Sequence, residues 1–160
     1  MKKERSLEKL IARQLIKKKK TIAVAESCTG GLLSKRLTDI SGSSKYTSLN
    51  IITYSKKSKN KILNVPLDLL KKYGAVSPEV AASMAIGIKK LAKSDIGFSI
   101  TGIAGPKGGT KEKPVGLVYF GLIKGKKIET RKVLFGSNLS RDKIRWLATQ
   151  YALNWLRQVL

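Results

Sequence analysis

The residues with the clearest chemical potential lie in one short stretch, residues 25–31, which reads AESCTGG and stands where an apolar run gives way to a helical pattern. Its two hydroxyl groups and its thiol are all candidate nucleophiles, provided that a neighbouring group accepts the proton. The chain contains no histidine. The base must therefore be a lysine with a lowered pKa, a carboxylate, or a tyrosine that relays the proton.

Ser27 lies at the predicted junction between a strand and a helix. The N-terminus of a helix leaves backbone N–H groups without partners, and those of residues 29–31 could hold a phosphate or the oxyanion of an acyl-transfer intermediate. The alternative is that Ser27 or Thr29 only caps the helix. We interpret Cys28 as a small packed residue rather than a reactive thiol.

Four lysines follow the second predicted strand and are candidates for the base: Lys56, Lys57, Lys59 and Lys61. Crowding of like charges lowers the pKa of any member that is partly buried, and a neutral lysine can accept a proton from serine. Most of the four must be solvated. Their spacing does not decide which one would act.

The elements that would position these residues alternate along the chain. Apolar runs of strand length and helical stripes predict their types, and serine, proline and glycine mark several of their ends. We predict strands over 21–25, 46–54, 96–103, 115–123 and 128–135, and helices over 7–15, 32–37, 55–63, 66–73, 77–91 and from about 140 onward.

This alternation predicts an α/β protein, a three-layer α/β/α sandwich with a mixed, mostly parallel sheet of about five strands. The length suits a single domain, 1–160, with an N-terminal helix within 1–20 packed on it. Ligands bind at the carboxyl ends of such strands. The two glycine-rich loops, 27–31 and 102–109, both follow strands directly, so they should meet at one site.

The composition is strongly basic, with 33 Lys and Arg against 10 Asp and Glu and a net charge of +23. Such a charge favours phosphate, on nucleic acid or on a small ligand. However, 26 of the basic residues are lysines spread along nearly the whole chain, a pattern that drift toward lysine in an AT-rich genome also produces. With few aromatic residues and no groove-reading helix, we expect no specific nucleic-acid partner.

Other features bear on the compartment. No apolar run is long enough to span a membrane, the single cysteine excludes an internal disulfide, and the first ten residues, MKKERSLEKL, lack the apolar core of a signal peptide. We therefore expect a cytoplasmic protein without a membrane partner.

Six motifs occur in order along the chain, and together they resemble the CinA C-terminal domain family from about Thr21 to the last helix. They are AESCTGG at 25–31, SGSSKY at 41–46, YSKKSKNKILNV at 54–65, GAVSPEVA at 74–81, TGIAGPKGGTKEKPVG at 101–116 and RDKIR at 141–145.

Stand-alone members of the CinA C-terminal domain family are nicotinamide-nucleotide amidases. The resemblance implies hydrolysis of the carboxamide of nicotinamide mononucleotide to nicotinate mononucleotide and ammonia, with no metal and no cofactor. It implies that Ser27 is the nucleophile and that Lys59 accepts its proton, with Tyr54 as a third catalytic residue through which the proton could pass. It thereby selects one of the four lysines.

The substrate of such an amidase carries a phosphate, and several residues are candidates for binding it or the ring. Each of them is also a common turn residue. They are Thr29, Gly30, Gly31, Ser43, Ser44, Thr101, Gly102 and Gly105.

The sequence departs from the family pattern at two positions, with Lys56 in place of the common Asn and Asn64 in place of Gly. Relatives are usually oligomeric, so we expect a homo-oligomer, most simply a dimer, to which Trp146, Tyr151 and Trp155 could contribute a face. The alternative function is a nucleotide-binding or nucleic-acid-associated CinA-like protein without amidase activity.

Overall fold

The computed structural model describes residues 6–160 and contains one five-stranded sheet with helices on both faces. The strands are β1 (Ile22–Glu26), β2 (Thr47–Ile52), β3 (Ile96–Gly102), β4 (Leu117–Lys124) and β5 (Lys127–Leu134). The helices are α1 (Leu7–Lys17), α2 (Leu32–Thr38), α3 (Lys56–Leu63), α4 (Leu67–Tyr73), α5 (Pro78–Ala92) and α6 (Arg141–Val159), with a short 3-10 helix, η1 (Ser43–Lys45).

The strand order is β2-β1-β3-β4-β5. β1 pairs in parallel with both β2 and β3, whereas β4 is antiparallel to both of its neighbours. β5 therefore runs in the same direction as β3, and β4 alone is reversed. This is the mixed, mostly parallel sheet that the sequence predicts.

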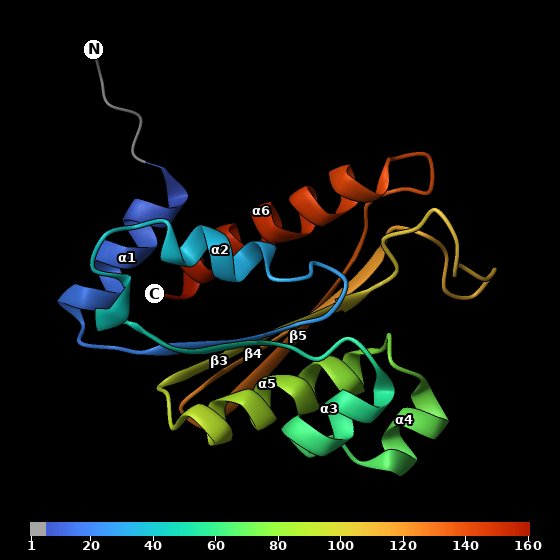
Figure 1. Cartoon of the computed structure of the whole chain (residues 1–160), viewed down its shortest axis with the longest axis horizontal. Helices are drawn as coiled ribbons and strands as arrows, with labels where there is room; N and C mark the ends of the chain where they lie inside the picture. The colour runs from blue at the N-terminus through green and yellow to red at the C-terminus, as the bar shows by residue number, and fades with distance from the viewer. Residues whose placement is uncertain (1–5) are drawn as a thin grey trace.

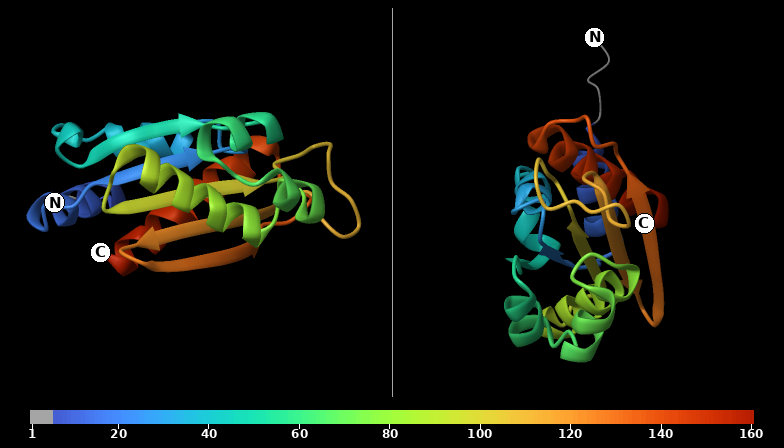
Figure 2. Two further views of the ribbon diagram at one scale, coloured as in Figure 1. Left: turned by 90° about the horizontal axis from the view of Figure 1, so that it is seen from below. Right: turned by 90° about the vertical axis from the view of Figure 1, so that its right-hand side faces the viewer.

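The helices form two layers around the sheet (Figure 1). α1, α2 and α6 cover one face, and α3, α4 and α5 cover the other, as the end-on panel of Figure 2 also shows. Each layer has its own apolar cluster, one including Phe98, Phe120 and Trp155 and the other including Val80, Met84 and Ile88. The predicted three-layer sandwich is confirmed.

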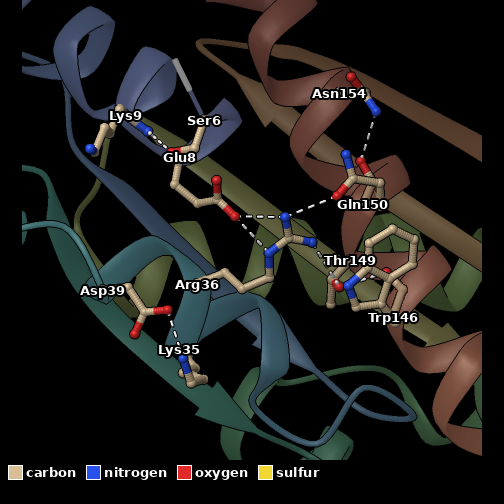
Figure 3. Close-up of polar contacts among 10 residues, drawn as sticks. All are labelled: Ser6, Glu8, Lys9, Lys35, Arg36, Asp39, Trp146, Thr149, Gln150 and Asn154. Atoms are coloured by element: carbon tan, nitrogen blue, oxygen red, sulfur yellow. Dashed lines mark hydrogen bonds and ion pairs between the residues drawn. The ribbon is translucent and has the colours of Figure 1, made fainter. Parts of the chain in front are cut away.

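The layer of α1, α2 and α6 is joined by the Arg36 guanidinium (Figure 3). From α2, Arg36 donates to Glu8 on α1 at 2.8 Å and to Gln150 on α6 at 2.9 Å. It also donates to Thr149 at 3.4 Å. Because these groups are only partly exposed, the contacts fix the position of α2, whose N-terminus adjoins Ser27.

On the other face, α5 lies unusually close to the sheet. Gly121 of β4 makes this possible, because a Cβ at that position would lie 2.3 Å from the carbonyl oxygen of Ala81. Ser99 donates to the same carbonyl at 2.6 Å.

The register of the three parallel strands determines which residues meet at their carboxyl ends. Glu26 of β1 is paired with Ile52 of β2 and with Ile100 of β3. The residues that follow, including Ser27 and Thr53, therefore stand side by side. The loop of residues 103–116, coloured yellow to orange, extends beyond the sheet at this same end (Figures 1 and 2).

Several predicted details are corrected or refined. The first helix, predicted within 1–20, spans Leu7–Lys17, and residues 1–5 lie outside the described part of the chain. Trp155 cannot contribute to a dimer face because it is 1% exposed and packs edge-on against Phe98. Tyr151 packs against Phe120, so Trp146 is the one exposed member of that trio.

Asn64, where the family pattern has Gly, ends α3 in the left-handed conformation with φ 56°. Asparagine tolerates this conformation better than other residues with a Cβ, so the departure is structurally conservative. None of the helices described between residues 6 and 160 combines the length and apolar character needed to cross a bilayer.

Candidate active site

Ser27 and Lys59 form a buried pair at the carboxyl end of β1. The ammonium nitrogen of Lys59 lies 2.9 Å from Ser27 Oγ. Lys59 is 0% exposed and Ser27 is 7% exposed. A serine hydroxyl and a lysine amine in hydrogen-bond contact, shielded from water, have the arrangement that a serine nucleophile with a lysine base requires.

Two backbone carbonyls orient the Lys59 amine. Its Nζ donates to the oxygen of Thr53 at 2.6 Å and to that of Tyr54 at 3.4 Å. Burial lowers the pKa of Lys59 from 10.5 to about 8, because desolvation disfavours the charged form. A neutral amine that gives its two N–H groups to these carbonyls directs its lone pair at Ser27.

The start of α3 places Lys59 in this position. Ser55 caps the helix because its hydroxyl accepts from the backbone N–H of Ser58. The Ser58 hydroxyl in turn accepts from the backbone N–H of Ser55. Lys59 then lies in the second turn, on the same face as Leu63, and both side chains are buried. The lysines at 56, 57 and 61 are exposed.

Glu26, the last residue of β1, is fully buried and caps α2. Its carboxylate accepts from the backbone N–H of Gly31 at 3.2 Å, of Leu33 at 3.1 Å and of Ser34 at 2.7 Å. The hydroxyls of Thr29 and Ser34 also donate to it. The N–H of Gly31 is therefore occupied by the protein, which corrects the prediction that this residue presents a free N–H group to a ligand.

The rest of the turn differs from that prediction as well. The N–H of Gly30 donates to the Ser27 carbonyl at 3.1 Å. Among the described residues, no protein acceptor is found for the N–H groups of Cys28 and Thr29. Arg145 of α6 donates to the Thr29 carbonyl at 3.0 Å. Thr29 thus has the free N–H predicted for it, Gly30 and Gly31 do not, and the N–H of Cys28 is an additional donor next to Ser27.

Tyr54 contributes its backbone carbonyl to Lys59, not its side chain. The side chain lies on the surface, with the residue 60% exposed, and its hydroxyl accepts from Arg141 at 2.9 Å. Because Lys59 contacts Ser27 directly, no tyrosine relay is needed between them. The proposed passage of the proton through the Tyr54 hydroxyl is therefore corrected.

A cavity of about 220 Å³ opens beside the Ser27–Lys59 pair. Ser27, Lys59, Tyr54, Thr101, Gly102 and Gly105 all line it, so the structure brings these predicted residues together. The other lining residues are Cys28, Ala75, Val76, Ile103, Ala104, Lys107, Gly108 and Arg141. The two glycine-rich loops meet here, as their positions after parallel strands predict.

Other predicted binding residues are not in the cavity. Thr29, Gly30 and Gly31 adjoin it without lining it. Ser43 and Ser44 belong to η1, which precedes β2. The backbone carbonyl of Tyr46, the residue after η1, accepts from the N–H of Ile22 at the start of β1. Both serines therefore lie at the opposite end of the sheet from Ser27.

A larger groove of about 440 Å³ lies between α3 and α5. It contains Ser83 and Lys90, but no hydrogen bond joins them among the described contacts. Its other lining residues are largely apolar. Ser27 and Lys59 thus lie in the smaller cavity and not in this groove.

Cys28 is adjacent to Ser27 but has the character of a packed residue. It is 5% exposed, and burial raises the pKa of its thiol to about 12. A thiolate is therefore scarce at neutral pH. This agrees with the interpretation that Cys28 is not the nucleophile.

Several residues with a part in the site escaped sequence reasoning. Glu26 belongs to the AESCTGG motif, and an acid at the end of an apolar strand and the start of a helix is the capping signal that could have found it. Arg141 and Arg145 belong to the RDKIR motif, far from Ser27 in the sequence. Lys107 lies in the second glycine-rich loop.

The fold and this site define the class: an α/β protein with a serine–lysine pair at the carboxyl ends of parallel strands. The model of the family described as CinA C-terminal domain matches residues 4–160. The chain belongs to this family.

Relatives and solved structures agree. A CinA-like protein from Syntrophomonas wolfei is 50% identical over 155 residues, which cover 97% of this chain and 37% of the relative. A competence-damage inducible protein from Halothermothrix orenii is 51% identical over 159 residues, which cover 98% of this chain and 38% of that relative. The chain thus spans less than two fifths of the length of these curated relatives.

Two crystal structures have the same fold. The competence damage-inducible protein A from Klebsiella pneumoniae superposes with a TM-score of 0.91 at 32% identity, covering 95% of this chain and 93% of that one. A CinA superfamily protein from Escherichia coli gives a TM-score of 0.91 at 32% identity, covering 100% of this chain and 94% of that one.

Proposed function

We propose that the protein is a metal-independent serine amidase that hydrolyses the carboxamide of nicotinamide mononucleotide to nicotinate mononucleotide and ammonia. The observation that carries this proposal is the contact of 2.9 Å between Lys59 Nζ and Ser27 Oγ in a buried setting. The substrate class comes from the resemblance to the nicotinamide-nucleotide amidases.

In the first half of the reaction, neutral Lys59 accepts the proton of Ser27 as Oγ attacks the carboxamide carbon. The N–H groups of Cys28 and Thr29 are the donors available for the resulting oxyanion. When the tetrahedral intermediate collapses, the Lys59 ammonium gives its proton to the leaving nitrogen. The C–N bond breaks, ammonia leaves, and a nicotinoyl ester remains on Ser27.

The second half consumes water. Lys59, neutral again, accepts a proton from a water molecule that attacks the ester, and then returns it to Ser27 Oγ as the C–O bond breaks. The products are nicotinate mononucleotide and the free enzyme. The carbonyls of Thr53 and Tyr54 hold the amine in one orientation for both proton transfers.

The proposal is tested by ammonia release from nicotinamide mononucleotide in buffer containing a chelator. We expect release by the unaltered protein and a loss of at least about a thousandfold in Ser27→Ala and in Lys59→Ala, because both groups act as one unit. Thermal unfolding of each variant should show that the fold is retained.

Two variants serve as matched controls. Lys61→Ala removes an exposed lysine from the same helix, and Ser43→Ala removes a serine from the opposite end of the sheet. Both should retain full activity. Undiminished release by folded Ser27→Ala, or release that requires an added metal ion, contradicts the proposal.

A further inference from the structure

The cavity beside Ser27 is lined by cationic groups and by no carboxylate among the described residues. Lys59 is one of the cations, but it is buried and bound to Ser27 and to two carbonyls. The other two, Lys107 and Arg141, have no acidic partner in the described part of the chain. The cavity therefore has an uncompensated positive charge away from the reacting pair.

Arg141 is held in place by contacts that leave it free to bind a ligand. It donates to the carbonyl of Gly105 at 2.8 Å and to the hydroxyl of Tyr54 at 2.9 Å. These contacts use one N–H on each of its two terminal nitrogens, so further donors remain. A pre-oriented guanidinium with free donors is well suited to a phosphate.

Lys107 approaches the same cavity from the second glycine-rich loop. It is exposed, and its amine has no hydrogen-bond partner among the described residues. No protein acceptor is found there for the backbone N–H groups of Lys107 and Gly108 either. The loop thus offers an exposed cation together with unpaired backbone donors, a combination that binds anions.

The placement relative to the catalytic pair is set by Tyr54. Its carbonyl contacts Lys59 at 3.4 Å, and its hydroxyl contacts Arg141 at 2.9 Å. Arg141 and Lys59 are therefore joined through one tyrosine residue, and both line the cavity that also contains Ser27. A ligand that fills both positions has an amide at one end and an anion at the other.

We propose that Lys107 and Arg141 form an anion subsite that binds the phosphate of the nucleotide substrate, and so select phosphorylated carboxamides over the corresponding nucleosides. This inference rests on the proposed amidase function and adds the residues that determine its substrate class. Other nearby cations are engaged elsewhere: Lys113 donates to the carbonyl of Tyr73, and Arg145 donates to that of Thr29.

The test compares nicotinamide mononucleotide with nicotinamide riboside, which lacks the phosphate. For Lys107→Ala and for Arg141→Lys, we expect the ratio of kcat/KM for the mononucleotide to that for the riboside to fall at least about tenfold, because each removes a charged hydrogen bond to phosphate. Most of the loss should be in KM. Lys111→Ala, an exposed lysine in the same loop, is the matched control and should leave the ratio unchanged.

Binding measured by calorimetry on Ser27→Ala separates the subsite from the chemistry. Tighter binding of the mononucleotide than of the riboside, lost on adding Lys107→Ala, supports the subsite even if the unaltered protein releases no ammonia. An active enzyme whose phosphate preference survives in both Lys107→Ala and Arg141→Lys overturns the subsite and leaves the amidase proposal standing.

Discussion

At the scale of single residues, the site depends on a lysine kept where its charged form is unfavourable. Burial lowers the pKa of Lys59 to about 8, while Thr53 and Tyr54 accept its N–H groups. At neutral pH roughly a tenth of such amines are neutral, far more than of an ordinary lysine. The proposed mechanism thereby has a usable base without histidine.

The pH dependence of the proposed amidase activity follows from this pKa. Protonated Lys59 cannot accept the Ser27 proton, so kcat/KM for the mononucleotide should rise about tenfold per pH unit up to about pH 8 and then level off. Initial rates from about pH 6 to about pH 10 check this. A rate that is flat below pH 8, with the protein folded throughout, would contradict the role of Lys59 as base.

At the scale of elements, the β1–α2 turn is organised by a carboxylate rather than by the helix N-terminus alone. Glu26 accepts three backbone N–H groups and two hydroxyls while buried. All of its partners are donors, which an acceptor-only carboxylate satisfies. The cap fixes the turn that contains Ser27. Gly31, in the left-handed conformation with φ 95°, is the N-cap residue of α2.

Replacement of Glu26 by Gln should therefore be costly. The amide turns a donor toward other donors, so we expect a loss of about 3 kcal/mol in the free energy of unfolding and a Tm lower by roughly 6 to 12 °C. The kcat should fall as well. Glu79→Gln, in the first turn of α5 and without a described ion pair, is the matched control and should cost less than about 1 kcal/mol. Equal effects of the two changes would exclude a special role for Glu26.

Much of this arrangement was predictable at the same scale. Apolar periodicity identified the strands and helices, and topology brought the two glycine-rich loops together. The helical periodicity of α3 could not select Lys59, because Lys56, seven residues before Leu63, lies on the same face of the helix as Leu63. Only the path of the chain from β2 into α3 shows which of the two lysines is buried. Topology alone could have excluded Ser43 and Ser44, since they precede β2 and so lie at its amino end.

At the scale of the whole molecule, the excess of positive charge is mostly uncompensated. The chain has 33 basic and 10 acidic residues. The ion pairs among the described residues are mainly at the surface, such as Lys35 with Asp39 and Lys127 with Glu129. Self-repulsion of this kind destabilises the compact state, and salt screens it. The charge thus acts on stability whether or not it also attracts a ligand.

Two exposed lysines in one helix make this effect measurable. Lys56 lies in the first turn of α3, which has no acid, and Lys61 lies in the last turn. A cation is unfavourable at the first position and favourable at the second.

At low ionic strength, Lys56→Gln should therefore raise the Tm by about 2 °C, whereas Lys61→Gln, which removes the same charge, should not. The Tm of all three proteins should rise as salt is added. The difference in Tm between the two variants should become smaller, because salt screens the interaction of each lysine with the helix ends. Thermal unfolding from about 0.01 to about 0.5 M sodium chloride checks the difference between the variants and the rise of the Tm with salt. An equal shift in the two variants would show that net charge alone matters, and a Tm that does not rise with salt would show that the basic surface costs the fold nothing.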